Sequence, residues 1–394
     1  MSDVLTHVRY LAEEIGPRGT GTQEEAAAAD YAAGQLSGMG LPYEKQEFRA
    51  VASQNAFPLA INMVALLAVI VYPLGGSLSR WIAAGLAMST PFLLWQVIRY
   101  SNSILRPLLP QVNSRNVVAS IEPRDEIRQR VVILAHLDTN RCRLIWQSSM
   151  IRHIEPLTWL TFGMLASLGL IYLAGAILGG PGWTWWVSLL PAAYAVGSII
   201  TLWRDDRTPF SPGANDNAAS VAVALEIAAR LSLEPLRNSE VWLAFTGAEE
   251  SDHAGLYELL REHDSLLRQA VFIGLEGVGG GNIVYLTREG VCFHYRPDPE
   301  LLAQVERVAA SRTDLDVGAA QMTVEDEVGT LRRVGYRAIC IAGRDPDTGS
   351  LPHWHRPDDT LGTISVEAMG TAADFVTALL DELDRQTEAT CAHS

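Results

Sequence analysis

Residues 130–139, RVVILAHLDT, predict a strand that is buried on both faces and ends in polar side chains. Continuous apolar runs of this kind are typical of parallel strands covered on both sides by helices. The pattern recurs at residues 239–251, SEVWLAFTGAEES, at 270–281, AVFIGLEGVGGG, and at 336–345, YRAICIAGRD. Residues 215–232 predict one of the helices between these runs. We therefore predict an α/β fold with a largely parallel central sheet flanked by helices.

Polar, chemically active side chains follow three of these predicted strands. His136 and Asp138 end the first run, Glu249 and Glu250 follow the second, and Glu276 follows the third. In open α/β sheets, ligands bind at the carboxyl ends of the strands. We therefore expect these five side chains to lie near one another.

Three further candidates come from two segments outside the predicted strands. Asp216 stands just before a predicted helix, in GANDNAAS, and LPHWHRPDDTL supplies His353 and His355. Imidazole and carboxylate together suit zinc. Two metals that share one carboxylate need about five protein ligands and a base for the water between them. The sequence supplies such an inventory, drawn from His136, Asp216, Glu276, one of the pair Glu249 and Glu250, and the histidines at 353 and 355.

Two aspartates are predicted to support the histidines. Asp138 is expected to assist catalysis by orienting His136, since carboxylates commonly orient metal-bound imidazoles. Asp359, four residues after His355, is expected to serve that second histidine in the same way.

The adjacent pair Glu249 and Glu250 predicts a division of roles. Neighbouring side chains in extended backbone point to opposite sides. One of the two is therefore expected to bind metal and the other to act as the general base. His253, His263 and His294 have no matching partners in the sequence and are not predicted to act at the site.

Four long stretches are apolar and free of charged residues, and each is about long enough to cross a bilayer. They cover residues 57–79, 81–98, 156–182 and 183–203. Gly-rich turns join them in pairs, which predicts two helical hairpins, at 57–98 and 156–203. Eight of the ten tryptophans lie in or beside them, as in a membrane aromatic belt. The remaining residues, 1–56, 99–155 and 204–394, are predicted to form one discontinuous soluble domain.

Charge and cysteine usage predict the location of that domain. Arginines cluster on the soluble side of the hairpins, whereas their far turns offer only Arg80, which predicts a cytoplasmic domain in a plasma or inner membrane. The N-terminus lacks a signal-peptide pattern, and the four cysteines are expected to be free thiols. The net charge of -15 argues against nucleic acid as a partner. Oligomeric state is not predicted.

The motifs AHLDT, GANDNAAS, FTGAEES and HRPDDT together resemble a known family. They are similar to the zinc exopeptidases of the bacterial leucyl aminopeptidase, aminopeptidase Y and glutamate carboxypeptidase type, peptidase family M28. The resemblance extends over nearly all of the chain outside the hairpins and implies the zinc exopeptidase fold. It also implies these roles: His136 and Glu276 on one zinc, Glu250 and His355 on a second, Asp216 bridging both, and Glu249 as general base.

The chain departs from the family pattern in two respects. The family usually has Asp where this chain has Glu276, so the extra methylene shifts the carboxylate. The two hairpins are also insertions around the strand that carries His136.

The resulting prediction is a membrane-anchored exopeptidase with two zinc ions per chain and no other cofactor. An aminopeptidase acting on peptides is preferred. Two alternatives on the same fold are a single-zinc enzyme similar to glutaminyl cyclases and a non-catalytic receptor or scaffold. The expected partners are a peptide substrate and the lipid bilayer.

Overall fold

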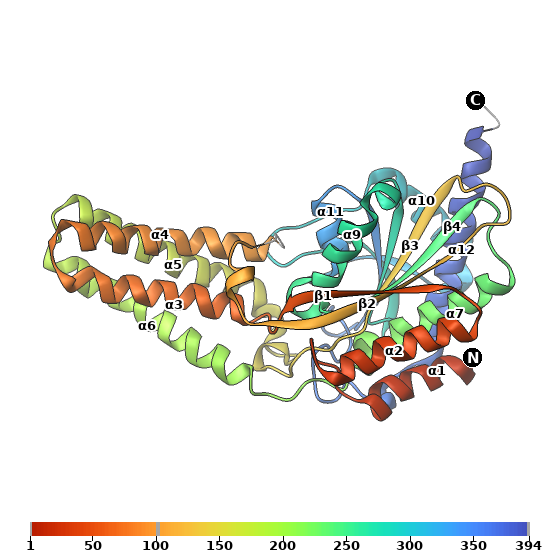
Figure 1. The fold of residues 1–394 in the computed structure, drawn as a ribbon, viewed down its shortest axis with the longest axis horizontal. Coiled ribbons are helices and arrows are strands. Elements are labelled where there is room, and N and C mark those ends of the chain that lie inside the picture. The colour runs from red at the N-terminus through yellow and green to blue at the C-terminus, as the bar shows by residue number, and fades with distance from the viewer. Residues whose placement is uncertain (1, 100–102, 392–394) are drawn as a thin grey trace.

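A computed structural model describes residues 2–99 and 103–391, and within them eight strands form one sheet. The strands lie in the order β1-β2-β4-β3-β5-β8-β6-β7 (Figure 1). Their bounds are β1 Tyr43–Val51, β2 Gln111–Ile121, β3 Gln129–His136, β4 Ser239–Thr246, β5 Val271–Glu276, β6 Asn282–Arg288, β7 Gly318–Gln321 and β8 Arg337–Arg344.

The four central strands, β4, β3, β5 and β8, run parallel to one another. They correspond to the four apolar runs in the sequence, so the predicted α/β class and its parallel centre are confirmed. Towards the edges the directions mix. The pairs β1–β2, β2–β4 and β8–β6 are antiparallel, and β7 is parallel to β6. The sheet as a whole is therefore mixed, and the prediction of a largely parallel sheet holds only for its centre.

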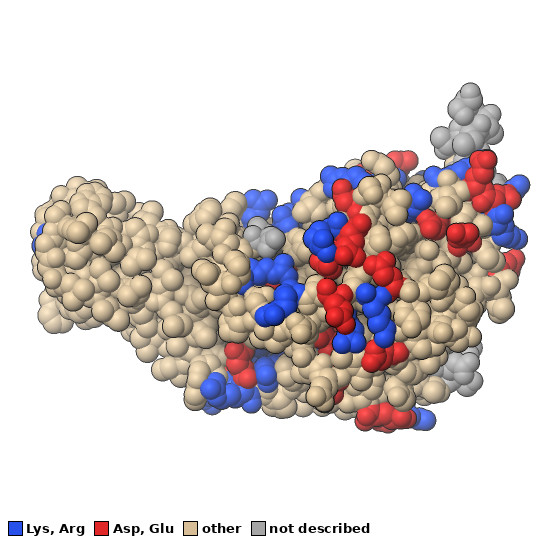
Figure 2. Space-filling view, in the orientation of Figure 1, with Lys and Arg blue, Asp and Glu red and all other residues tan. Residues whose placement is uncertain are grey.

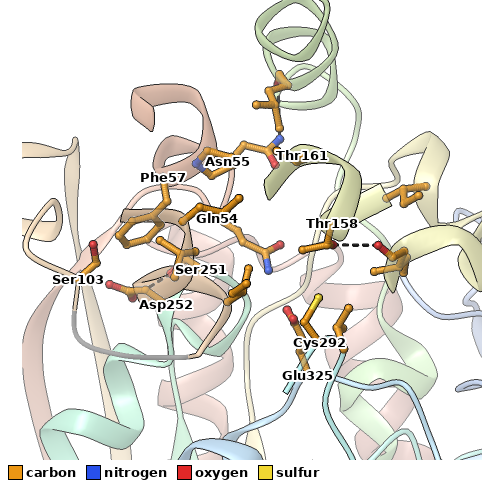
Figure 3. Close-up of a pocket in the computed structure, with 18 of the residues that line it drawn as sticks. Gln54, Asn55, Phe57, Ser103, Thr158, Thr161, Ser251, Asp252, Cys292 and Glu325 are labelled. Atoms are coloured by element: carbon orange, nitrogen blue, oxygen red, sulfur yellow. Dashed lines mark hydrogen bonds between the residues drawn. The ribbon is translucent and has the colours of Figure 1, made fainter. Parts of the chain in front are cut away.

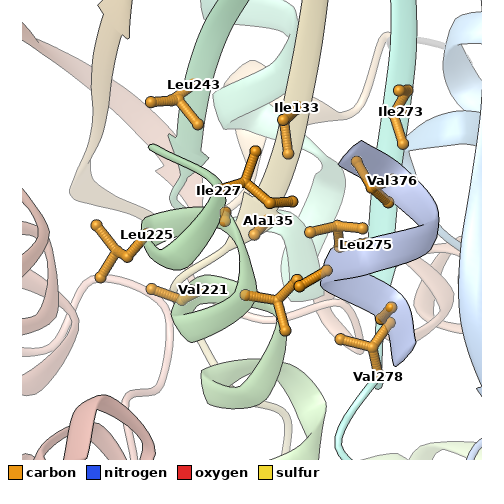
Figure 4. Packing of buried hydrophobic residues seen from close by; sticks show 14 of the residues in the cluster. Ile133, Ala135, Val221, Leu225, Ile227, Leu243, Ile273, Leu275, Val278 and Val376 are labelled. Carbon is orange, nitrogen blue, oxygen red and sulfur yellow. The ribbon is translucent and has the colours of Figure 1, made fainter. Parts of the chain in front are cut away.

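Helices cover both faces of the sheet, because alternate residues of each strand point to opposite sides. Along β3, Val131, Ile133 and Ala135 belong to one buried cluster, and Val132 and Leu134 to the other. The first cluster includes residues of α1 (Ser2–Arg9), α2 (Gln23–Gly38), α7 (Ser220–Leu233), α10 (Pro299–Ser311) and α12 (Val366–Cys391). The second includes residues of α9 (Ala254–Leu267) and α11 (Glu327–Arg333). Figure 4 shows α7 and α12 packed against the central strands.

Four apolar helices form a bundle that extends away from the sheet (Figure 1). They are α3 (Ala56–Val71), α4 (Gly76–Ile98), α5 (Ile154–Ile177) and α6 (Gly182–Asp205). All four are long and apolar enough to cross a membrane. The helices pair as predicted and the first turn lies within the Gly-rich segment 74–80, but α4 begins at Gly76, before the predicted start at residue 81. The chain turns before Gly76, because Gly75 and Gly76 adopt φ values of 95° and 80°, which are easily accessible to glycine.

The interior of the bundle combines close packing with hydroxyl pairs. The rings of Tyr72 and Tyr172 stack with their centroids 4.2 Å apart. The hydroxyl of Tyr72 lies 2.7 Å from that of Thr184, and Tyr172 donates to Ser188 at 3.1 Å. A Cβ atom at Gly175 would overlap the Tyr72 hydroxyl, so glycine permits this approach. Small residues and buried hydroxyl pairs of this kind are the usual contacts between membrane helices.

The outer surface of the bundle is apolar, whereas charged residues gather on the sheet part and at the junction (Figure 2). Ile70, Trp186 and Leu190 are 62%, 71% and 69% exposed. A continuous apolar surface of this size is unusual for a protein that meets only water. Elsewhere in the described part, Cys142, Cys292 and Cys340 form no disulfide, and the side chain of Cys391 lies outside it.

Candidate metal centre

Three neighbouring strands bring the predicted side chains to one edge of the sheet. His136 is the last residue of β3, and Glu276 is the last residue of β5, which pairs with β3. On the other side of β3, β4 ends at Thr246 and leads to Glu249, the first residue of the short helix α8 (Glu249–Asp252). The parallel centre of the sheet thus places all three at its carboxyl edge, as the sequence predicted.

Asp216 lies between the two histidines. Its Oδ1 is 3.2 Å from His136 Nε2, and its Oδ2 is 3.0 Å from His355 Nε2. Glu276 Oε1 lies 3.6 Å from His136 Nε2, and Glu250 Oε1 lies 2.9 Å from His355 Nε2. The five side chains therefore form two groups, His136–Asp216–Glu276 and Asp216–Glu250–His355, each with ligand atoms within 4.8 Å of one another. Asp216 is the member that both groups share.

The hydrogen bonds of His136 leave one ring nitrogen available for a cation. Its Nδ1 lies 3.0 Å from the backbone carbonyl oxygen of Asp138, which can only accept, so Nδ1 carries a proton. In the neutral ring, Nε2 is then an acceptor that faces the Asp216 carboxylate, another acceptor. Neither His136 Nε2 nor either oxygen of Asp216 has a hydrogen-bond partner among the described residues. This donor set fits a metal ion.

The electrostatics of the cluster favour positive charge in this place, which either a second proton on His136 or a bound cation would supply. Burial raises the pKa of Glu249 well above its ordinary value and that of Glu276 to about 8. Burial acts against the charged form of His136 as well, but Glu249 and Glu276 outweigh it and raise the pKa of the imidazole. So many carboxylates in one buried place repel one another, and a bound divalent cation would relieve that repulsion.

Asp138 takes a different role from the one predicted. Its carboxylate accepts the backbone N–H groups of Glu249 at 3.0 Å and Glu250 at 3.2 Å, and the Thr20 hydroxyl donates to it at 2.7 Å. The carboxylate lies 3.7 Å from His136 Nδ1, farther than the backbone carbonyl of the same residue. The free N–H groups at the start of a helix attract a carboxylate. Asp138 therefore orients His136 through its main chain and holds α8 through its side chain.

Asp359 also has a different partner from the one predicted. Its two oxygens accept the backbone N–H groups of Asn215 at 2.7 Å and Asp216 at 3.1 Å. His355 Nδ1, which it was expected to contact, has no hydrogen-bond partner among the described residues. Tight turns between His353 and Asp359 carry the aspartate to the segment before α7. Asp359 thus positions Asp216 and does not contact the His355 ring.

The two adjacent glutamates separate, but for a reason other than the one predicted. Glu249 and Glu250 begin a helix, so their backbone is not extended. Glu250 contacts His355, whereas Glu249 Oε1 lies 3.3 Å from His253 Nε2. His253 is buried, and its Nδ1 lies 2.9 Å from the Thr330 hydroxyl. A histidine without an evident partner in the sequence therefore contacts the predicted base.

Two buried residues that the sequence did not single out support the loops of the site. The guanidinium of Arg18 donates to several backbone carbonyl oxygens, among them those of Leu137 at 2.9 Å and Gly213 at 2.8 Å. Glu25 accepts the N–H of Ala248 at 2.9 Å, next to Glu249. In the sequence, the only sign of this supporting role is an arginine within the Gly-rich segment GPRGTGT. Arg18 links the end of β3 to the segment before Asp216.

The fold is similar to that of solved zinc exopeptidases and aminopeptidases. The zinc aminopeptidase BSAP from Bacillus subtilis matches with a TM-score of 0.56 and 16% identity, over 97% of this chain and 94% of that chain. Bacteroides thetaiotaomicron glutaminyl cyclase, bound to N-acetylhistamine, matches with a TM-score of 0.57 and 16% identity, over 96% and 97%. At such identities, these likenesses establish the fold alone.

Sequence comparison finds a similar family. Residues 205–380, a little less than half of the chain, match Peptidase family M28. The region includes Asp216, Glu249, Glu250, Glu276 and His355. Aminopeptidase YwaD of Bacillus subtilis (strain 168) is 30% identical over 187 residues, which cover 45% of this chain and 39% of that protein. The chain thus spans less than half the length of this relative.

Proposed function

We propose that this protein is a membrane-anchored, zinc-dependent aminopeptidase that removes N-terminal residues from peptides and binds two zinc ions per chain. The observation that carries the proposal is the position of Asp216, whose two oxygens face two different histidines at 3.2 and 3.0 Å. A carboxylate shared in this way is what a two-metal site needs. Each histidine has a further carboxylate beside it, so both positions have three protein ligands.

The roles follow from the two groups. His136, Asp216 and Glu276 would hold one zinc ion, and Asp216, Glu250 and His355 the other. Bound zinc would polarise the scissile carbonyl and lower the pKa of a water. Glu249, buried beside both groups, would take the proton of the attacking water and pass it to the leaving amine. The crowded carboxylates favour a substrate with a free ammonium group, which supports an aminopeptidase.

A cyclase with one zinc ion is the second candidate, because a glutaminyl cyclase has a similar fold. One relative detected by sequence is an aminopeptidase, and both ligand groups are complete in this chain. These two observations favour the peptidase. A scaffold without catalysis is less consistent with two complete groups.

Metal removal is the first test. The full chain, purified in detergent, is expected to contain about two zinc ions and to hydrolyse aminoacyl amides. A chelator should abolish the hydrolysis, and added zinc should restore it, because the six clustered side chains need the metal for catalysis. Metal content is measured by mass spectrometry. About one ion per chain, with cyclisation of N-terminal glutamine and no hydrolysis, would establish the cyclase instead, and no bound zinc would favour the scaffold.

We further propose that α3, α4, α5 and α6 cross a bilayer and that residues 1–56, 99–155 and 204–394 form the peptidase domain outside it. The apolar surface of the bundle supports this. Exposed tryptophans lie near both ends of α6, and the helix from Trp186 to Trp203 is roughly 26 Å long at about 1.5 Å per residue, close to the thickness of the hydrocarbon core. The arginines at the sheet end favour a cytoplasmic peptidase domain.

The proposed membrane anchor can be tested by extracting the chain from membranes and by labelling introduced cysteines. The chain should stay with membranes through an alkaline carbonate wash and be released by detergent. Cysteines introduced as Ser77→Cys, at the far turn, and Glu126→Cys, on the exposed sheet part, mark the two sides. In intact cells an impermeant maleimide should label the first and not the second, with the unmodified chain as background. The opposite labelling would reverse the orientation, and release by carbonate would rule out the anchor.

A further inference from the structure

A cavity of about 380 Å³ lies where the helix bundle meets the sheet part. All four bundle helices contribute to its wall, with Phe57 from α3, Ile98 from α4, Leu157 from α5 and Leu202 from α6. Glu249, the proposed base, lines the same cavity from α8. The inserted hairpins therefore form part of a space that reaches the candidate metal centre.

The cavity changes character along its length. Figure 3 shows Phe57 and Thr161 at its bundle end, and Cys292 and Glu325 at the opposite end. The bundle side is mainly apolar, whereas the sheet side also offers Glu249 and Asp252. Asp252 is engaged, because Arg106 lies 2.8 Å from it. The volume falls within the usual range for sites that bind small ligands or parts of larger ones.

Two buried N–H groups in the wall suit a peptide backbone. Arg143 and Trp146 follow β3 and line the cavity, and they are only 7% and 9% exposed. Arg143 donates from Nη1 to Gln54 at 3.0 Å, but its Nε and the Nε1 of Trp146 have no hydrogen-bond partner among the described residues. Buried donors are normally satisfied. A rotation of these side chains towards the cavity would pair both N–H groups with carbonyl oxygens of a peptide, whereas an acyl chain offers no acceptor along its length.

Trp146 also connects the cavity to the metal ligands. Its ring meets the ring of His355 edge to face, with centroids 4.4 Å apart. A chain lying along this wall would thus pass from the apolar helix ends to the side chains that surround Asp216. The helix ends lie at the depth where a bilayer would meet water, since they are the sheet-side ends of the four candidate spans.

We propose that this cavity binds the substrate and that the substrate is an apolar peptide that partitions into the bilayer, with its N-terminal end delivered to Glu249. This inference rests on the proposed function and adds its substrate class. The helix ends contact the apolar side chains, and Arg143 and Trp146 bind the carbonyl oxygens. The hairpins then act both as an anchor and as one half of the binding site.

The test compares two peptides with the same N-terminal residue, one followed by an apolar segment and one by a Ser/Gly segment. The full chain is reconstituted in phosphatidylcholine vesicles, and kcat/KM is measured for each peptide. We expect the apolar peptide to be preferred by at least about tenfold, since each well-placed apolar contact contributes strongly to discrimination. In Leu157→Trp, which fills the cavity, the preference should fall to near unity. Leu160→Trp, on the same helix and similarly exposed but outside the cavity wall, is the matched control and should keep it.

The outcomes separate this inference from the proposed function. Hydrolysis of neither peptide would contradict the peptidase itself. Equal rates on both peptides in the wild-type chain would overturn the substrate class and leave the peptidase standing. An equal loss of preference in both tryptophan variants would also overturn it, because the effect would then come from the bundle as a whole. Phospholipid that co-purifies with the wild type and not with Leu157→Trp would identify a lipid site instead.

Discussion

Glu249→Gln is expected to lower kcat for an aminoacyl amide by about 10²- to 10⁴-fold and to leave bound zinc unchanged. The amide keeps the size of the side chain and its contact with His253 Nε2, which lies 3.3 Å from Glu249 Oε1. It cannot take a proton from water. Because the ligands of both groups stay in place, KM should change little. The measurements are steady-state kinetics and metal content per chain.

Stability provides a second readout for this variant. Burial raises the pKa of Glu249, so the charged carboxylate is costly in this position, and a neutral amide should not lower Tm. Glu234→Gln, an exposed glutamate at the end of α7, is the matched control and should behave like the wild type. Normal turnover in Glu249→Gln would remove Glu249 from the mechanism. Loss of zinc together with loss of turnover would make it a ligand.

The central strands of the sheet could be predicted from the sequence, whereas the strands at its edges could not. β3, β4, β5 and β8 are buried on both faces, so each appears as an unbroken apolar run. The edge strand β1 is mostly exposed, and β7 has only four residues. β1 is rich in polar residues and β7 consists mainly of small ones, and such strands form largely through pairing with a neighbour, which a local pattern does not reveal.

At the candidate site, the metal ligands could likewise be predicted from the sequence, whereas the contacts of the supporting residues could not. The ligand candidates stand at strand ends or in recognisable motifs, so the sequence alone was sufficient to select them. Asp138 orients His136 as expected, but through its carbonyl group, and the carboxylates of both Asp138 and Asp359 bind backbone N–H groups that were not foreseen. Such bonds depend on the path of the loops and not on sequence spacing. For the same reason, Arg18 and His253 were missed.

Asp216→Ala is expected to have the largest effect on metal binding, from about two zinc ions per chain to fewer than one. Both groups lose a ligand in this variant, because Asp216 Oδ1 faces His136 and Oδ2 faces His355. Turnover should be lost as well. An independent readout is thermal stability, since a ligand that binds the folded state raises Tm. Added zinc should raise the Tm of the wild type and not that of the variant.

Asp384→Ala separates this effect from the general cost of losing a buried carboxylate. Asp384 is 8% exposed and accepts the backbone N–H groups of Arg237 and Asn238 at 2.9 and 2.8 Å, away from the site. Its loss should lower Tm, because two buried donors lose their acceptor, while zinc content and the zinc-dependent rise in Tm remain. If Asp216→Ala kept one tightly bound zinc ion and Asp384→Ala kept two, only one of the two histidine groups would depend on Asp216. A shared carboxylate requires that both groups fail together.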